Sequence, residues 1–494
     1  MPATEQLEIE TKYDVDEHAI LPALHELPGV ASVAQPVELD LEAVYFDTAD
    51  LALAANRVTL RRRTGGEDDG WHVKLPGSGS GRLEIRHPLG RVVSKVPIQV
   101  VRSVRVHVRD HELAPVVTLK THRIVHRLLD ADGEVLAEVA DDHVTAEVEG
   151  AEPDTWREWE VELVNGDLDL LEAAEPLLRS VGATPAKGPS KLARALGSRV
   201  PKPVDRVLPK KPLTADLFRL YAAAQVDAIR VRDPEVRRDL PDSIHKMRVA
   251  TRRLRSALAS YRPVVDREAG DVLRAELKWL AGELGAARDA EVLREHFAAT
   301  VAEQPVELVM GRVAGFIDDH LRGVYKAGRT QALAALESER YFRLLDSLDD
   351  LIADPPLTGD ERKAAKQLPE ILDHDYKRMR QAVRRMEAAA DDTERDHELH
   401  EVRKAAKRLR YAGESAEPVL GAEATALAGR AEQVQEVLGD HQDSVVARRL
   451  LRQLAVEVHL SGGNAFTYGR LHAAEEVRGE RSYQEFLELW PSLK

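Results

Sequence analysis

The pattern of apolar and polar positions changes character near residue 200. Residues 1–195 contain short runs in which apolar and polar residues alternate, and this period of two is typical of strands with one buried face. From residue 213 onward the apolar residues recur at helical spacing, and Ala, Leu, Glu and Arg dominate. The pattern therefore predicts an N-terminal β domain followed by an all-helical region.

Eight runs in the N-terminal part are predicted to be strands, and clusters rich in Gly, Pro or Asp separate them. The runs are residues 7–13, 57–63, 71–75, 82–86, 116–122, 135–142, 144–148 and 157–163. Two further stretches, residues 17–27 and 168–181, have helical periodicity. We therefore expect a mostly β domain with two helices.

A proline-rich segment separates the two parts. Residues 198–212 hold four prolines, which fit neither a helix nor a central strand, so this segment is predicted to be a linker. The expected domains are residues 1–197 and 213–494. The sequence DPPLTG at 354–359 divides the helical region into halves of about 213–353 and 360–494.

One basic segment occurs twice in the helical region. The sequence HKMRVATRRLR at 245–255 returns as HEVRKAAKRLR at 400–410, and LGAARD at 284–289 returns as LGDHQD at 438–443. Both pairs are separated by an offset near 155 residues. A shared offset between two independent matches indicates an internal duplication.

Each copy gathers its positive charge on one side of a helix, opposite a row of apolar residues such as Met247, Leu254 and Leu409. The basic rows are His245, Arg248, Arg252 and Arg255 in the first copy, and His400, Arg403, Lys407 and Arg410 in the second. Like charges four residues apart repel each other, so a stripe without compensating acids favours a bound polyanion. A solvated helix face is the alternative for either helix taken alone.

The overall composition limits the classes of function. The chain has 70 Lys and Arg against 85 Asp and Glu, and a net charge of −15 argues against general nucleic-acid binding. It has no cysteine, which excludes disulfides, thiolate metal sites and cysteine nucleophiles. Apolar runs are short and the N-terminus lacks a signal pattern. We expect a soluble cytoplasmic protein without a membrane or nucleic-acid partner.

The polar faces of the N-terminal strands are unusually rich in charge. Glu8, Glu10 and Lys12 share one face of the first strand, because side chains alternate. Comparable faces are Thr59, Arg61 and Arg63; His72 and Lys74; Arg82, Glu84 and Arg86; and Glu158, Glu160 and Glu162. A solvated outer face is the ordinary explanation for one strand, but five such strands favour a barrel with a charged interior. There, carboxylates would hold a divalent cation and basic groups would grip phosphates.

The sequence Glu8-Ile9-Glu10-Thr11-Lys12 resembles the N-terminal ExExK signature of the CYTH, or triphosphate tunnel metalloenzyme, family. Further segments follow in the order of that family: Tyr45-Phe46-Asp47-Thr48, Leu60-Arg61-Arg62-Arg63, His72-Val73-Lys74, Arg82-Leu83-Glu84, Lys120 to Arg123, Glu138 to Asp142, Glu160-Val161-Glu162 and Ser190-Lys191. The resemblance implies an eight-stranded antiparallel tunnel that hydrolyses inorganic triphosphate or short phosphate chains with Mg²⁺ or Mn²⁺.

The same resemblance implies roles for individual residues. The implied metal ligands are Glu8, Glu10, Asp142, Glu160 and Glu162, and the implied phosphate-binding residues are Arg61, Arg63, Lys74, Arg82, Lys120, Arg123 and Lys191. Lys12, with Glu8 and Glu10, completes the implied catalytic set. Lys120 and Arg123 have opposite strand parity, so both face inward only if a bulge intervenes. Arg86 stands where the family usually has an acid.

The duplicated helical segments resemble the CHAD family, named for its histidine-containing α-helical domain. That resemblance implies two pseudo-symmetric helical bundles around a basic cavity that binds inorganic polyphosphate. The implied binding residues are His245, Arg248, Arg252, Arg253, Arg255, His400, Arg403, Lys404, Lys407, Arg408 and Arg410. We expect Asp289, Asp440 and Asp443 to orient these side chains.

Together the two resemblances predict a triphosphatase whose helical partner attaches it to polyphosphate or to polyphosphate granules. Two alternatives stay open at this point. Arg86 favours a protein that binds polyphosphate without turnover. The tunnel chemistry also suits an organic triphosphate, as in an adenylate cyclase or a thiamine triphosphatase, although no purine pocket is evident in the sequence.

Overall fold

The computed structural model describes residues 4–77, 81–90, 95–202, 206–360 and 362–493. The chain divides into two compact units, Met1–Asp205 and Arg206–Lys494. Each unit has its own hydrophobic cores, so each is described by itself.

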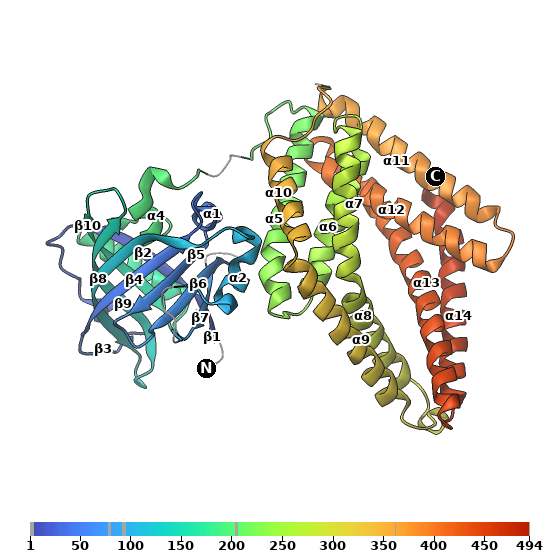
Figure 1. The fold of residues 1–494 in the computed structure, drawn as a ribbon, viewed down its shortest axis with the longest axis horizontal. Helices are drawn as coiled ribbons and strands as arrows, with labels where there is room; N and C mark the ends of the chain where they lie inside the picture. Colours follow the sequence, from blue (N-terminus) through green and yellow to red (C-terminus); the bar gives the residue numbers. More distant parts are fainter. Residues whose placement is uncertain (1–3, 78–80, 91–94, 203–205, 361, 494) are drawn as a thin grey trace. The chain divides into compact units, whose positions relative to one another are not determined.

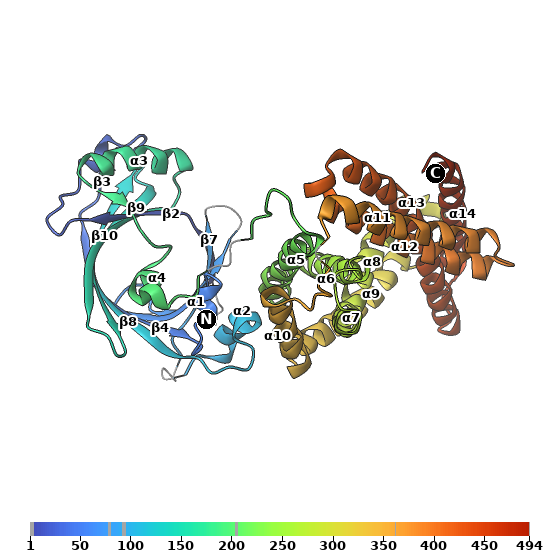
Figure 2. The same cartoon turned by 90° about the horizontal axis from the view of Figure 1, so that it is seen from above.

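The first unit is a strongly curled antiparallel β sheet (Figures 1 and 2). Its strands are β1 (Thr4–Glu8), β2 (Glu10–Val15), β3 (Ser32–Val33), β4 (Val37–Asp47), β5 (Thr59–Thr64), β6 (Gly70–Pro76), β7 (Arg82–His87), β8 (Ala114–Leu129), β9 (Val135–Val148), β10 (Asp154–Leu163) and β11 (Thr184–Pro185). They pair in the order β1-β7-β6-β5-β4-β8-β9-β10-β2-β11, and β3 adds to β8.

The N-terminal segment lies between the two ends of the curled sheet. Only Ile9 separates β1 from β2, yet β1 pairs with β7 and β2 pairs with β10. Residues 4–15 therefore hydrogen-bond to both ends of the path that runs from β7 to β10. This places the carboxylates of β1 and β2 between the walls of the sheet.

The structure corrects several of the predicted elements. The helix expected at 17–27 is wrong: Pro22 interrupts it, and only a 3-10 turn at Leu24–Glu26 forms. The two runs expected at 135–142 and 144–148 form the single strand β9. Strand β4 and helix α2 (Ile98–Val108) were not predicted. The sheet has eleven strands among the described residues, whereas eight were expected.

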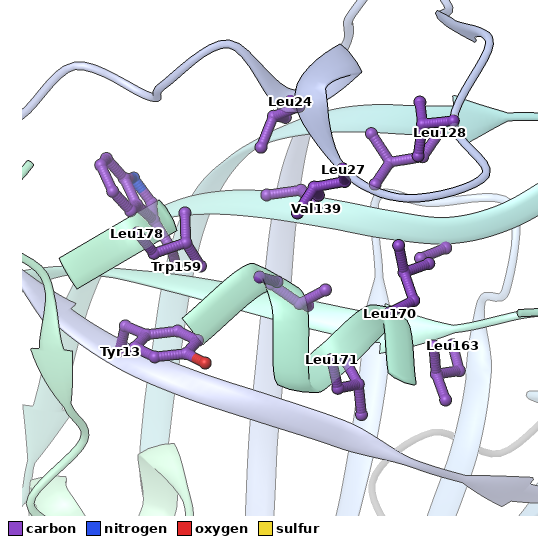
Figure 3. Close-up of a cluster of buried hydrophobic side chains, with 14 of the residues drawn as sticks. Tyr13, Leu24, Leu27, Leu128, Val139, Trp159, Leu163, Leu170, Leu171 and Leu178 are labelled. Atoms are coloured by element: carbon purple, nitrogen blue, oxygen red, sulfur yellow. The ribbon is translucent and has the colours of Figure 1, made fainter. Parts of the chain in front are cut away.

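Three helices cover different parts of the sheet. Helix α3 (Leu168–Ser180) packs its apolar face on the convex side of β8, β9, β10 and β2, around Trp159 and Leu178 (Figure 3). Helix α2 packs against β5, β6 and β7, on the convex side that carries Leu60 and Val73. Helix α4 (Lys191–Leu196) lies within the curl in Figure 2, where Leu192 packs among inward-facing apolar residues. Apolar packing therefore fills one end of the concave side.

The second unit consists of helices. They are α5 (Thr214–Arg237), α6 (Ser243–Ser260), α7 (Arg267–Glu283), α8 (Gly285–Ala302), α9 (Val313–Leu336), α10 (Glu339–Ala353), α11 (Ala364–Glu387), α12 (Asp392–Leu420), α13 (Ala422–Leu460) and α14 (Phe466–Leu489). The duplicated basic segments lie in α6 and α12, and the later matches lie in α8 and α13. Leu284 alone separates α7 from α8, whereas α13 runs unbroken through the corresponding position.

Helices α6 and α12 join the two halves of this unit directly. The hydroxyl of Tyr261, at the end of α6, lies 2.8 Å from the Ser415 hydroxyl of α12. Arg408 of α12 donates to the carbonyl oxygen of Ala259 at 2.6 Å. Buried hydrogen bonds of this kind need accurate geometry, so they fix how the two basic helices face each other.

None of the helices in the described ranges combines the length and the apolarity that a bilayer crossing requires.

Candidate functional site

A charged cavity occupies the concave side of the sheet. Its volume is about 320 Å³, and its lining includes nine Lys or Arg and seven Asp or Glu side chains from the sheet, from the loop between β5 and β6, and from α4. Eleven residues predicted from the sequence lie together in this lining: Glu8, Glu10, Lys12, Arg61, Arg63, Lys74, Arg82, Arg123, Glu160, Glu162 and Lys191. Strand alternation explains the common direction of the ten that lie on strands, because each occupies the inward parity of its strand, whereas Lys191 enters from helix α4.

Lys120 lies outside the cavity, which corrects its expected position. Residues Lys120 to Arg123 pair with β4 without a register shift, so their side chains point to opposite faces. Arg123 faces inward, and Lys120 faces the outer surface, where it contacts Glu147 at 2.6 Å. The bulge that would have turned both inward does not occur there.

Asp142 lies on the inward face of β9, beside Arg123, but it is not part of the cavity lining. Its side chain is fully buried, and it accepts two hydrogen bonds from Arg123, at 2.7 and 2.6 Å. The ammonium of Lys191 lies 2.8 Å away. Asp142 therefore holds two of the basic residues in place rather than facing the open space.

Three buried carboxylates surround the ammonium of Lys191. Its Nζ lies 2.8 Å from Asp142, 2.7 Å from Glu158 and 2.6 Å from Glu160. These acids form the one group of three in the described residues whose ligand atoms lie close enough to hold a metal ion. Burial lowers the pKa of Lys191, but the three carboxylates outweigh it and raise the pKa above its ordinary value. A protonated lysine thus stands where a cation could bind.

The carboxylate of Glu160 is ion-paired with several basic side chains. It contacts Lys12, Lys191 and Arg123, the last at 2.7 Å. Burial raises the pKa of Glu160, but Lys12, Lys191 and Arg123 lower it well below its usual range. Glu160 is therefore a negatively charged anchor for the basic side chains.

Glu162 has a different environment. It lies opposite Glu10 in the register of β10 and β2, and it has no ion-pair partner in the described part of the chain. Burial, followed by the charge of Glu8, raises the pKa of Glu162 to about 7. Glu8, Glu10 and Glu162 thus form a second carboxylate face, in which Glu8 pairs with Lys74, Glu10 pairs with Lys12, and Glu162 has no such partner among the described residues. This is the face whose chemistry fits a divalent cation bound through oxygen ligands.

The opposite wall is organised by Glu84, which the sequence did not single out as a site residue. Its buried carboxylate lies 3.0 Å from His72, 3.7 Å from Arg61 and 3.9 Å from Lys74. It also contacts Arg86, whose guanidinium lines the cavity and lies 3.8 Å from Glu8. Glu84 thereby directs several basic groups toward the open space.

Sequence reasoning also missed Arg127 and Tyr45. Both line the cavity; Arg127 pairs with Glu138 at 2.8 Å, and the Tyr45 hydroxyl accepts from Arg61 at 3.3 Å. Arg127 follows Arg123 by four residues on β8, so its inward parity was readable from the sequence. Tyr45 lies in one of the family-like segments but was given no role, because an inward aromatic residue has the same sequence pattern as a core residue.

In the helical unit, the repeated motifs pack against each other in space. Arg248 of α6 donates to the carbonyl oxygen of Gly285 at 2.9 Å and to Asp289 at 3.1 Å. In the second half, a Cβ added to Gly439 would lie only 3.3 Å from the guanidinium of Arg403. The repeated glycine therefore lets the guanidinium approach the neighbouring helix closely.

Four basic residues form a central group across α6 and α12: Arg248, Arg252, Arg403 and Lys407. Burial lowers the pKa of Lys407 to about 7, and the charges of Arg403 and Arg252 add to this effect. The Nε atoms of Arg248, Arg252 and Arg403 are buried without a hydrogen-bond partner in the described residues. Unused donors among mutually repelling cations are an arrangement that a bound anion would stabilise.

Other predicted polyphosphate ligands are engaged in ion pairs. The pairs are Arg253 with Glu414 at 2.8 Å, Lys404 with Glu401 at 2.6 Å, Arg408 with Asp375 at 2.8 Å, and Arg410 with Glu432 at 2.8 Å. Of the three acids expected to orient basic groups, Asp289 bonds to Arg248 and Asp443 lies close enough to act on Arg403. Asp440 lies 3.6 Å from Arg478.

His441 connects three helices of the second half. Its Nδ1 lies 3.0 Å from the carbonyl oxygen of Gly479 in α14, and its Nε2 lies 3.0 Å from Asp396 in α12. The first half has Ala287 at the corresponding place, where it packs in the core. The histidine is therefore a structural connection within α12, α13 and α14.

Comparisons with known proteins agree with this division of the chain. The CYTH domain family model matches residues 6–196, and the CHAD domain family model matches residues 220–452. Two uncharacterized proteins of Mycobacterium tuberculosis, MT2285 of strain CDC 1551 / Oshkosh and Rv2226 of strain ATCC 25618 / H37Rv, are each 39% identical to the chain over 497 residues. The match spans 97% of this chain and 94% of each relative. The chain belongs to the proteins that join a CYTH domain to a CHAD domain.

Two solved structures are similar to part of this CYTH–CHAD protein. The CHAD domain from the plant Ricinus communis is 27% identical, with a TM-score of 0.47, over 59% of this chain and 96% of that one. PptA from Streptomyces chartreusis is 21% identical, with a TM-score of 0.48, over 56% of this chain and 99% of that one.

Replacement of Lys191 by methionine is expected to destabilise the CYTH unit by about 3–5 kcal/mol at neutral pH, because three buried carboxylates lose their shared cation. Burial raises the pKa of Glu160, but its cations hold that pKa below the unfolded value, so their stabilisation is present at neutral pH and is lost in acid. The difference between Lys191→Met and wild type should therefore shrink below about pH 4.

Denaturant unfolding at several pH values measures this effect. Lys187→Met is the matched control, since Lys187 lies on the surface nearby. A loss of stability that is the same at pH 7 and at about pH 3, or the same for both variants, would contradict the role of Lys191.

Proposed function

We propose that the CYTH domain hydrolyses inorganic triphosphate or related short phosphate chains in a metal-dependent reaction. The observation that carries this proposal is the cavity lining, in which nine basic and seven acidic side chains face one space of about 320 Å³. A triphosphate carries dense negative charge on many oxygens, which basic side chains bind, and acids beside them bind the accompanying cation. We further propose that the curled sheet acts as a tunnel that encloses the phosphate chain.

The residues that fit the metal are fewer than the sequence suggested. Glu8, Glu10 and Glu162 would hold Mg²⁺ or Mn²⁺ after their side chains move closer together around the ion, because Glu162 lacks a basic partner among the described residues and burial beside Glu8 raises its pKa. Glu160 and Asp142 are already bound to Lys191 and Arg123. When bound, the metal would neutralise part of the phosphate charge and lower the pKa of a water molecule bound to it.

The protein side chains supply binding and orientation. Arg61, Arg63, Lys74 and Arg123 would hold phosphate oxygens beside the carboxylates of the cavity. Lys12 lies 3.0 Å from Glu10 and also contacts Glu160, so it would hold these two carboxylates in fixed orientations. The reaction then needs no protein nucleophile, since an oriented water can attack the terminal phosphorus.

One observation favours a second candidate, a tunnel that binds phosphate chains without turnover. The guanidinium of Arg86 contacts Glu84 and lies 3.8 Å from Glu8. It thus adds a fixed positive charge beside one of the three carboxylates that would hold the metal. A charge in this position strengthens anion binding and weakens cation binding at the same site.

For the CHAD domain we propose binding of inorganic polyphosphate, which would attach the enzyme to this polymer or to granules of it. Arg248, Arg252, Arg403 and Lys407 would form the centre of the site, with His245, Arg255 and His400 beside them. We propose that the two halves are pseudo-symmetric about this centre. Four basic residues that are already ion-paired would stabilise the packing of the helices rather than hold the anion: Arg253, Lys404, Arg408 and Arg410.

Removal of two carboxylates tests the hydrolase. The variant Glu8→Ala/Glu10→Ala should lower kcat/KM for triphosphate by about 100-fold or more, because the metal would lose two of its three ligands. Phosphate release with Mg²⁺ or Mn²⁺ is the measurement, and Glu38→Ala on the exposed side of β4 is the control. If wild type and the double variant are equally inert while triphosphate still binds, the binding-only alternative is correct.

Removal of two central cations tests polyphosphate binding. The variant Arg252→Ala/Lys407→Ala should weaken binding at least roughly tenfold and make the dependence of log affinity on log salt shallower by about 1, because fewer counterions are released. Titration of the full chain with long-chain polyphosphate at several salt concentrations measures both. Lys404→Ala/Arg410→Ala, on the same helix but ion-paired, should change little; an equal loss in both variants would remove the assignment of the central group.

The affinity for polyphosphate should rise as the pH falls from about 8 to about 6.5. Burial, with Arg403 and Arg252, lowers the pKa of Lys407 to about 7, so part of this residue is neutral above that pH. A bound polyanion favours the charged form, and binding at pH 7.5 should therefore take up protons. Calorimetry in buffers of different ionisation enthalpy measures this uptake. Lys407→Arg, which stays charged, should abolish it; unchanged uptake would contradict this explanation.

A further inference from the structure

Two histidines face each other on the outer surface of the CYTH sheet, away from the cavity. His122 of β8 and His143 of β9 are direct partners in the register, and their ring centroids are 6.3 Å apart. Their chain neighbours Arg123 and Asp142 form an ion pair on the inward side, so strand alternation places both imidazoles outside. Both side chains are a little over two-fifths exposed, at 44% and 43%.

Each imidazole has a carboxylate near one of its ring nitrogens. Asp40 Oδ1 lies 2.9 Å from Nδ1 of His122, and Asp141 Oδ1 lies 3.7 Å from Nε2 of His143. A neutral imidazole with its N–H toward the carboxylate presents a lone pair on the other nitrogen. A carboxylate behind a histidine is the arrangement that orients metal-binding imidazoles and makes them more basic.

The surroundings of the pair favour a cation. His122 and His143 lie in an open hollow of about 830 Å³, whose charged lining includes four acids, among them Asp40 and Glu42, and two basic residues. The two basic residues, Lys120 and Arg157, are both engaged: Lys120 with Glu147, and Arg157 with Asp141 at 2.7 Å. The hollow therefore has an excess of negative charge around the two imidazoles.

We propose that His122 and His143 form a surface site for a divalent transition-metal ion of the Zn²⁺, Ni²⁺ or Cu²⁺ class, with Asp40 as the nearby carboxylate. Imidazole nitrogen selects these ions over Mg²⁺ or Mn²⁺, so the site differs in chemistry from the carboxylates of the cavity. Two imidazoles on one tetrahedral Zn²⁺, with metal–nitrogen bonds of about 2 Å, have ring centroids roughly 5 Å apart. A side-chain movement of roughly 1 Å brings these rings to that separation.

An ion at this site would connect β8 to β9 directly behind the ion pair of Arg123 and Asp142. The two strands are hydrogen-bonded along their whole paired length, from Val117↔Val148 to Leu129↔Val135. The metal would therefore reinforce a wall that already exists and would leave the cavity open. The metal site is tested by measuring metal affinity and protein stability. This proposal can therefore fail or succeed independently of the proposed hydrolase activity.

Zn²⁺ titration of the full chain, in excess Mg²⁺ to occupy the cavity carboxylates, tests the site. His122→Ala and His143→Ala should each weaken one Zn²⁺ site at least tenfold, whereas His111→Ala, an exposed histidine of the same unit, should leave it unchanged. Zn²⁺ should also raise the unfolding temperature of wild type and not of the two variants. Absence of Zn²⁺ binding by wild type at about 100 μM, or equal affinity in all the variants, overturns the proposal.

Cu²⁺ supplies a second readout that does not depend on stability. Electron paramagnetic resonance of the Cu²⁺-loaded chain should show coupling to two imidazole nitrogens, reduced to one in His122→Gln and in His143→Gln. Glutamine keeps the size and polarity of the position, so these variants retain the surface of the sheet. An unchanged two-nitrogen spectrum in both variants would assign the ion to other histidines and overturn the proposal.

Discussion

Compensation of buried charge is the constraint on which the CYTH cavity depends. A sheet that turns carboxylates and guanidinium groups inward removes them from water, which costs several kcal/mol for each ion unless a partner replaces the solvent. Lys191 meets this requirement for three acids at once, and Glu84 meets it for basic residues on the opposite wall. The network therefore supports the cavity and sets the distribution of charge inside it.

The distribution of partners also separates structural charge from available charge. Glu160 and Asp142 share several cations, whereas Glu162 has no ion-pair partner in the described ranges. In the helical unit, Arg408 and Arg410 are paired with acids, whereas the guanidinium Nε atoms of Arg252 and Arg403 are buried without a partner there. In both domains, the candidate ligand-binding residues include those whose charge is not fully balanced by ion pairs or hydrogen bonds within the protein.

Strand alternation and helical periodicity were sufficient to predict the two kinds of domain, and with the family resemblance they predicted most of the charged residues that line the cavity. The alternation of Glu8, Glu10 and Lys12 predicted their common direction, and the same rule, applied without exception, places Lys120 outside. The pairing of β1 with β7 and of β2 with β10 could not be read from the sequence, because it depends on contacts between distant segments. For the same reason the sequence could not show that Lys191, on a short helix, would enter the carboxylate cluster.

The position of β1 and β2 has a consequence for the order of folding. Glu10 pairs across the sheet with Glu162, so the segment that begins the domain needs a neighbour made roughly 150 residues later. During synthesis, residues 4–15 lack one of their two strand partners until β10 has left the ribosome. The acids of β1 and β2 thus reach their final surroundings only when the whole domain exists, and a fragment that ends before β10 leaves them in water.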